Sequence, residues 1–279
     1  MATPYSNPST QKPYSVPLAI FISFFVLLAS ARKVNSAEGI SFDFTKFTQS
    51  DITLQGSAQI LSNGILALTK HVNPSWSEGR ALYTEPIPIW DASTGNVASF
   101  VTSFSFVVQD IPGRNPADGI VFFLAPPDTE IPNNSSGGKL GIVDGNNAFN
   151  QFVGVEFDSY INDWDADSAH IGIDVNSLIS LKTVKWNRVS GSLVNVGIIY
   201  DSLTKTLSVA VTHANGQIST IAQVVDLKAV LPEKVRVGFS AATTSGGQQI
   251  HDIHSWSFTS NLETTVSVTS ENINIKSYA

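Results

Sequence analysis

The chain of 279 residues contains no cysteine, so no disulfide can stabilise its fold and no cysteine-based zinc site can form in it. Charged residues are also scarce, at 14% of the sequence, and the formal net charge is −7. An acidic balance argues against nucleic acid or an anionic membrane surface as a partner. Gly-x-Ser-x-Gly and phosphate-loop motifs are absent as well, which argues against a serine hydrolase of that type and against a phosphate-loop nucleotide site.

The first 36 residues contain no acidic residue, and an apolar run within them extends from Val16 to Ala31. The run is short for a membrane span and is followed by small residues near Ala37, as at a signal peptidase site. We therefore expect residues 1–36 to be a secretory signal peptide and the product to be extracellular or vacuolar. Losing that segment removes three of the 16 basic residues and none of the 23 acidic ones, which changes the net charge to −10. No second long apolar run follows, so no membrane insertion is expected.

Residues 37–265 predict a single all-β domain, because apolar and polar residues alternate along many short segments. Turn residues separate the predicted strands at 201–205 and 214–217, and only residues 226–231 before Pro232 have a helical pattern. Many short strands with almost no helix indicate an antiparallel sandwich or barrel. Residues 266–279 are polar and are expected to form a disordered tail. The predicted strands span 98–108, 120–125, 152–157, 193–200, 206–212, 235–241 and 253–259.

The segment from Glu156 to His170 is the most distinctive part of the chain, since it holds five acidic residues, one asparagine and one histidine. On a strand, Glu156 and Asp158 point to one face while Val155 and Phe157 point to the other, into the core. Carboxylates crowded together repel one another unless a cation neutralises them. The segment therefore predicts a divalent metal site, with a solvated acidic loop as the alternative. Oxygen ligands suit calcium, and a histidine among carboxylates suits manganese or another transition ion.

A rival interpretation of the same segment is catalytic. Glu156 and Asp158 resemble the start of the Glu-x-Asp-x-x-Glu arrangement of some sandwich-fold glucanases, which use paired carboxylates. The second glutamate would have to stand at position 161, which is occupied by Ile161. Glycoside hydrolysis is therefore the weaker interpretation, and we expect no catalysis.

Several motifs in fixed order closely resemble those of the legume lectins, and the resemblance covers nearly the whole chain after residue 36. They are Ser41-Phe-Asp-Phe44, Ser103-Phe-Ser-Phe106, Pro116-Ala-Asp-Gly119, Phe122-Phe-Leu-Ala-Pro126, Val155-Glu-Phe-Asp158, His170-Ile-Gly-Ile-Asp-Val-Asn-Ser177, Val225-Asp-Leu227 and Ser255-Trp-Ser-Phe-Thr259. The resemblance implies an antiparallel jelly-roll sandwich that holds adjacent Mn²⁺ and Ca²⁺ ions and binds sugars without altering them.

Carried over residue by residue, the resemblance implies two overlapping sets of metal ligands. Ser180 would reach the manganese ion through a water molecule. The implied manganese ligands are Glu156, Asp158, Asp165 and His170. The implied calcium ligands are Asp158, the carbonyl of Tyr160, Asn162 and Asp165.

The resemblance also implies a sugar site around Asp118, which would follow a cis Ala117–Asp118 peptide bond. The amide of Gly138 and the side chain of Asn162 would donate hydrogen bonds to sugar hydroxyls, and the ring of Tyr160 would stack on the sugar. The loop 241–249 would set specificity through Thr244 and Ser245. Its length is closer to that of galactose and N-acetylgalactosamine binders than to that of mannose and glucose binders.

Single-site affinity for a monosaccharide should be weak, so we expect a homodimer or homotetramer that binds glycans of glycoproteins or glycolipids multivalently.

Two overlapping glycosylation sequons occur at Asn133 and Asn134, of which one would be used. The alternatives are a lectin specific for mannose or glucose, and a lectin-like defence or storage protein with weak or no sugar binding. The tryptophans 76, 90, 186 and 256 are expected in the core or on a sheet face. Trp164 lies in the segment from Glu156 to His170 that is expected to bind the metals, which we call the metal loop.

Overall fold

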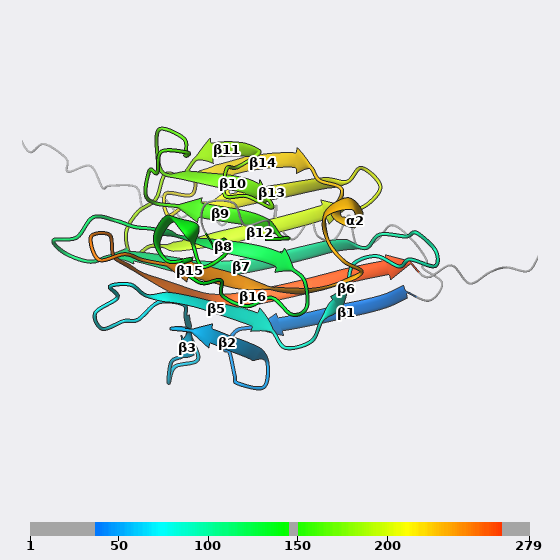
Figure 1. Cartoon of the computed structure of the whole chain (residues 1–279), viewed down its shortest axis with the longest axis horizontal. Coiled ribbons are helices and arrows are strands. Elements are labelled where there is room, and N and C mark those ends of the chain that lie inside the picture. The colour runs from blue at the N-terminus through cyan, green and yellow to red at the C-terminus, as the bar shows by residue number, and fades with distance from the viewer. Residues whose placement is uncertain (1–36, 145–149, 264–279) are drawn as a thin grey trace, which may run out of the picture. The chain divides into compact units, whose positions relative to one another are not determined.

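The computed structural model describes residues 37–144 and 150–263, whose strands form two antiparallel sheets (Figure 1). The predicted signal peptide and C-terminal tail lie outside the described residues. Within the described part, no helix is long and apolar enough to cross a membrane. The two antiparallel sheets confirm the predicted all-β jelly-roll sandwich.

The two sheets contain the following elements in spatial order. The first sheet is β14 (Ile218–Val224), β13 (Thr206–Thr212), β12 (Leu193–Asp201), β7 (Ser99–Asp110), β16 (Gln249–Glu263), β4 (Leu66–Ala67) and β3 (Gln59–Ile60), with β1 (Ala37–Phe44) paired to β16. The second sheet is β11 (Lys182–Lys185), β10 (His170–Val175), β9 (Val153–Asp158), β8 (Gly119–Ala125), β15 (Lys234–Ala242), β5 (Glu78–Tyr83) and β2 (Ile52–Gly56), with β6 (Ile87–Pro88) paired to β15.

The predicted strands and turns agree with the structure apart from small shifts at their ends. The predicted strand at 206–212 coincides with β13, whereas β16 is longer than the predicted 253–259. The helical pattern at 226–231 corresponds to the short helix α2 (Leu227–Val230), and a 3₁₀ turn, η1, covers Gly137–Lys139. Alternation predicts β13 well because its buried and half-buried residues alternate strictly along the strand.

Aromatic side chains from both sheets fill the space between them. Phe106 of β7 meets Phe157 of β9 edge to face, with ring centroids 4.8 Å apart. Phe104 of β7 meets Phe239 of β15 in the same way at 4.9 Å. Such contacts add to the burial of large apolar surfaces, which is the main stabilising contribution in a chain without disulfides.

Four strand ends of the second sheet converge at one place. Asp158, the last residue of β9, pairs with Gly119 at the start of β8 and with His170 at the start of β10. Ala242, the last residue of β15, pairs with Gly119 from the other side. The loops that leave these ends therefore lie next to one another.

Two of these loops cross between the sheets. The segment 111–118 leads from β7 in the first sheet to β8 in the second, and the segment 243–248 leads from β15 back to β16. The two crossing loops are joined by a parallel bridge between Asn115 and Gly247, and the Gln248 amide donates to the Asn115 carbonyl at 2.9 Å.

Candidate functional site

A buried cluster of two carboxylates and an imidazole lies where β9 and β10 pair. One potential ligand atom from each of Glu156, Asp158 and His170 lies within 4.8 Å of the other two. The Nε2 atom of His170 is 2.9 Å from Oε1 of Glu156. All three side chains are buried, and the strand alternation predicted for Glu156 and Asp158 is confirmed, since Val155 and Phe157 belong to the core. The arrangement has the composition of a divalent metal site.

The cluster has room for its side chains because position 172 is a glycine. Gly172 of β10 stands opposite Glu156 of β9 in the ladder. A Cβ atom at Gly172 would lie 2.0 Å from Oγ of Ser180 and 2.6 Å from Oε1 of Glu156. A side chain there would displace the Glu156 carboxylate, so the small residue is a condition for the cluster.

The electrostatics of the cluster favour a cation. Burial, followed by repulsion from Glu156 and Asp165, raises the pKa of Asp158 well above its usual value. Burial likewise raises the pKa of Asp165 to about 6. Burial alone would lower the pKa of His170, but its hydrogen bond to Glu156 and the nearby carboxylates outweigh burial and raise that pKa. The shifts of Asp158 and Asp165 come first from burial, to which neighbouring carboxylates add, and a bound cation would offset both contributions.

Two short-range hydrogen bonds fix the conformation of the loop after β9. The Tyr160 amide donates to Oδ1 of Asp158 at 2.7 Å, and the Asn162 amide donates to Oδ2 of Asp165 at 2.6 Å. The four residues implied as calcium ligands are thus tied to one another in pairs. Oδ1 of Asn162 is buried and has no hydrogen-bond partner among the described residues. An unpartnered buried oxygen on a residue that is bonded to the half-buried Asp165 is suited to bind a cation.

Asp118 is buried beside the end of β9. The Ala117–Asp118 peptide bond is cis, as the resemblance implied. The Asp118 amide donates to the Ala242 carbonyl at 3.2 Å, and the Asp118 carbonyl accepts from the Ser159 amide at 2.8 Å. The side chain is only 3% exposed, its Oδ2 has no partner within the described chain, and burial raises its pKa to about 7. A fixed and unpartnered carboxylate can accept hydrogen bonds from a polar ligand.

The remaining candidates come from three separate segments that meet Asp118. A Cβ atom on Gly137 would lie 2.7 Å from Cγ2 of Thr244 and 3.8 Å from both carboxylate oxygens of Asp118. A Cβ atom on Gly138 would lie 2.4 Å from Oδ1 of Asn162. The structure therefore brings Asp118, Gly138, Asn162 and Thr244 together around Gly137.

Tyr160 and Ser245 lie at the edge of this group. The Tyr160 side chain is 41% exposed, so its ring is open to a ligand. Ser245 is also exposed, and its carbonyl accepts a hydrogen bond from Nε2 of Gln248 at 2.9 Å. The sequon asparagines Asn133 and Asn134 are exposed as well.

Asp174 is a site residue that the sequence interpretation did not single out. It is fully buried on β10, and the Ser180 hydroxyl is 2.7 Å from its Oδ1 and 2.6 Å from Oε1 of Glu156. Burial, then the charge of Glu156, raises the pKa of Asp174 well above its usual value. Strand alternation could have found it, because residues 170, 172 and 174 share one face of β10.

The expectation for the tryptophans is wrong at one position. Trp186 and Trp256 are buried and Trp90 is half-buried, but the side chain of Trp76 is 62% exposed. Trp76 precedes β5 in a turn, with a backbone φ of 50°. Trp76 is exposed because it lies in a turn and not on a strand, as the prediction had assumed.

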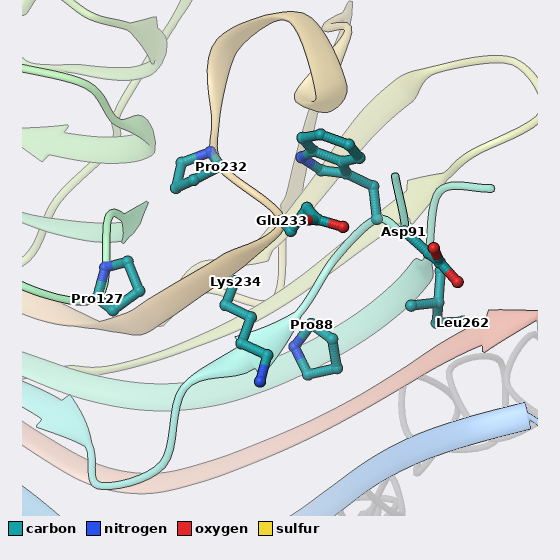
Figure 2. Close-up of a pocket in the computed structure, with 8 residues that line it drawn as sticks. Pro88, Asp91, Pro127, Pro232, Glu233, Lys234 and Leu262 are labelled. Atoms are coloured by element: carbon teal, nitrogen blue, oxygen red, sulfur yellow. The ribbon is translucent and has the colours of Figure 1, made fainter. Parts of the chain in front are cut away.

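A cavity of about 450 Å³ lies away from these residues (Figure 2). It surrounds Lys234, the first residue of β15, whereas the candidate site adjoins Ala242, the last residue of that strand. None of the candidate metal or sugar residues lines it. Its lining consists of Pro88, Trp90, Asp91, Pro127, Pro232, Glu233, Lys234 and Leu262.

Comparisons with known proteins agree with one another. The family model described as the legume lectin domain matches residues 39–274. A protein described as a bark agglutinin of Robinia pseudoacacia is 72% identical over 264 residues, which cover 94% of this chain and 96% of that protein. The galactose-binding lectin of Arachis hypogaea is 57% identical over 255 residues, which cover 89% and 93%. The solved structure of winged bean acidic lectin complexed with methyl-α-D-galactose aligns with a TM-score of 0.75 at 43% identity, covering 81% of this chain and 100% of the other.

Proposed function

Because the chain belongs to the legume lectin family, we propose that it is a calcium- and manganese-dependent lectin for terminal galactose or N-acetylgalactosamine. Family members bind carbohydrate without catalysis, so the chain is a carbohydrate-binding lectin and not an enzyme. The observation that carries the proposal is the meeting of Asp118, Gly138, Asn162 and Thr244 beside the buried acid and histidine cluster.

The residues present fit the two ions. Glu156, Asp158, Asp165 and His170 would hold Mn²⁺, with Ser180 reaching that ion through water. Asp158, the Tyr160 carbonyl, Asn162 and Asp165 would hold Ca²⁺. The bound ions would neutralise the buried carboxylates and keep the metal loop in one conformation. Three buried side chains within ligand reach and the unpartnered Oδ1 of Asn162 support this assignment.

The chain's own groups would recognise the sugar. The Asp118 carboxylate would accept hydrogen bonds from two adjacent hydroxyls, since its Oδ2 has no other partner among the described residues. The Gly138 amide and the Asn162 side-chain amide would donate, and the exposed ring of Tyr160 would pack on the apolar face of the sugar. Thr244 and Ser245 would contact the part of the sugar that distinguishes one epimer from another.

The galactose assignment is supported by the length of the loop 241–249 and by two relatives. The Arachis hypogaea protein is named as a galactose-binding lectin, and the winged bean lectin was solved with a methyl galactoside. Inhibition of binding to an immobilised glycoprotein by galactose, N-acetylgalactosamine, mannose, glucose and fucose tests the assignment. Stronger inhibition by mannose or glucose than by galactose would contradict it. A protein that binds no glycan would fit the lectin-like defence or storage alternative.

Biological binding would depend on several sites acting together, because one sugar offers few contacts. We propose a secreted homodimer or homotetramer that binds glycans of glycoproteins or glycolipids. The exposed positions of Asn133 and Asn134 support glycosylation at one of them. Their sequon hydroxyls, on Ser135 and Ser136, lie 3.3 and 2.6 Å from Oε2 of Glu78.

Two neighbouring glycines give a matched test of the crossing loop. A Cβ atom on Gly247 would lie 2.3 Å from Cβ of Ala117, whereas one on Gly246 would meet nothing within 4 Å. Gly247→Ala should therefore push Ala117 and Asp118 out of place and weaken galactose binding by about tenfold or more, an effect of roughly 1.4 kcal/mol. Gly246→Ala should bind as the wild type does. Calorimetric titration of both variants measures the difference, and equal affinities would refute the role given to Gly247.

A further inference from the structure

A second, smaller apolar cluster lies on the face of the second sheet that points away from the core between the sheets. Two of its side chains, Leu140 and Ile142, come from the segment 126–144 that follows β8. That segment also contains Gly138, whose amide is assigned above to the sugar. It therefore folds back and packs on the sheet. The buried residues of the cluster are Leu82, Val121, Phe123, Ala125, Leu140, Ile142, Phe152 and Leu178.

Arg80 of β5 is buried beside this apolar cluster and is only 1% exposed. Its guanidinium carbon lies 5.1 Å from the centre of the Phe123 ring. Burial lowers the pKa of Arg80 to about 10, although the charge of Glu78 opposes that shift. The guanidinium therefore stays protonated at neutral pH. A buried cation destabilises a fold unless hydrogen bonds replace its lost hydration.

The hydrogen bonds of Arg80 all go to the segment that contains Gly138. Its Nε donates to the Gly141 carbonyl at 2.7 Å, and its Nη2 donates to the Ile142 carbonyl at 3.4 Å. Its Nη1 donates to Oγ1 of Thr129 at 2.9 Å. Each guanidinium nitrogen thus has an acceptor in the segment 126–144, and the planar fork fixes three points of that segment relative to β5.

Residues 135–141, which we call the glycine turn, are closed and held at one end. The Gly141 amide donates to the Ser135 carbonyl at 2.8 Å, which closes the turn. Ser240 of β15 stands opposite Arg80 in the ladder, and its hydroxyl donates to the Leu140 carbonyl at 2.6 Å. The end of the turn is therefore bonded to two neighbouring strands by side chains that share one face of the sheet.

The start of the glycine turn is bonded to the same strand, and its tip meets the sugar site. Oγ of Ser136 donates to Oε2 of Glu78 at 2.6 Å. At the tip, a Cβ atom on Gly138 would lie 2.4 Å from Oδ1 of Asn162. Because the backbone comes this close to Asn162, a displaced turn would change where the Gly138 amide stands in the site.

We propose that Arg80 and Ser240 are positioning residues for sugar binding, which hold the glycine turn so that the Gly138 amide can donate to one sugar hydroxyl. The inference rests on the proposed function, because that function assigns the Gly138 amide to the sugar. Both side chains act through the turn and do not touch the ligand. A donor that is already in place needs no ordering when the sugar binds, which raises the affinity.

Calorimetric titration of the full-length protein with galactose and its monodeoxy derivatives tests this role. Arg80→Met keeps an apolar stem and removes the guanidinium, so it should lower galactose affinity about three- to tenfold. The loss should vanish for the one monodeoxygalactose that lacks the hydroxyl bound by Gly138, because the amide then has no partner in either protein. Ser240→Ala should show the same pattern with a smaller loss.

Arg236→Met is the matched control. Arg236 also belongs to the second sheet and is half-buried, but its Nη1 donates to Oγ1 of Thr53 and to the Tyr83 carbonyl, at 3.3 and 3.2 Å. Its replacement should leave galactose affinity unchanged even if it lowers the Tm. All variants are titrated at a temperature at which circular dichroism shows them folded, so that reduced stability cannot imitate reduced affinity.

The outcomes separate the positioning role from the proposed function. Wild-type galactose affinity in folded Arg80→Met would overturn the role. An equal loss for galactose and for every monodeoxygalactose would overturn it too, because the damage would not be confined to the Gly138 amide. If Arg80→Met does not fold, Ser240→Ala decides by the same two criteria. A wild-type protein that binds no galactose would overturn the proposed function, and the positioning role with it.

Discussion

Replacing Asp118 with asparagine is expected to abolish detectable sugar binding, with a loss of affinity of about a hundredfold or more. The buried carboxylate would accept two charge-assisted hydrogen bonds, each worth about 1.5–3 kcal/mol. Asparagine keeps the shape but removes the charge and replaces one acceptor with a donor. That donor would face sugar hydroxyls and would leave a buried polar group poorly paired.

Retention on immobilised galactose and calorimetric titration measure this effect. Asp163→Asn is the matched control, because Asp163 is exposed and belongs to neither proposed ligand set. The control should bind as the wild type does. Circular dichroism and metal content should be unchanged in both variants, which separates loss of recognition from loss of folding. An Asp118→Asn protein that still binds galactose within tenfold of the wild type would refute the role of Asp118.

Removal of divalent ions is expected to have an equally large effect, abolishing sugar binding reversibly. Without cations, Glu156, Asp158 and Asp165 repel one another in a buried site, and Asn162 loses the ion that would orient it. Chelation followed by dialysis should eliminate retention on galactose, and adding Ca²⁺ and Mn²⁺ together should restore it. Undiminished binding by a protein shown to be free of metal would contradict metal dependence.

The stability of the metal-free protein should also depend on pH in a defined direction. The carboxyls of Asp118 and Asp165 have folded-state pKa values of about 7 and about 6, raised by burial from 3.8. Groups with a raised pKa stabilise the fold while protonated, and that stability is lost as the pH rises from about 4 through about 7. Metal ions bind the ionised carboxylates, so they stabilise the protein most at high pH. The gap in Tm between metal-loaded and chelated protein should therefore be wider at pH 8 than at pH 5. Calorimetry measures it, and a narrower gap at pH 8 would contradict the argument.

Local patterns in the sequence predict the strand parts of the site well. Alternation places Glu156 and Asp158 on one face of β9, because strand geometry alone determines it. The same rule reaches Asp174, yet a single acid in a mostly apolar strand is not conspicuous without its neighbours. Its significance appears only when Ser180 joins it to Glu156.

Contacts between loops are beyond such patterns. Gly137 meets Thr244 although more than a hundred residues separate them, and only the shared end of β8, β9 and β15 brings them together. The turn that exposes Trp76 also depends on tertiary contacts, since buried Thr243 holds its base. The resemblance to a family supplied Gly138 and Thr244, which propensity and periodicity could not, whereas it gave no indication that Trp76 would be exposed.

The two crossing loops have a mechanical consequence. Each is anchored in one sheet at its start and in the other at its end, and the bridge between Asn115 and Gly247 couples them. Asp118 and Thr244 lie at the ends that these loops have in the second sheet, where the Asp118 amide donates to the Ala242 carbonyl, so the two residues would keep their relative positions if one sheet slid over the other. The loops at one end of the second sheet therefore carry the proposed sugar site, and the packing of Phe104 against Phe239 stabilises the sandwich without setting the geometry of that site.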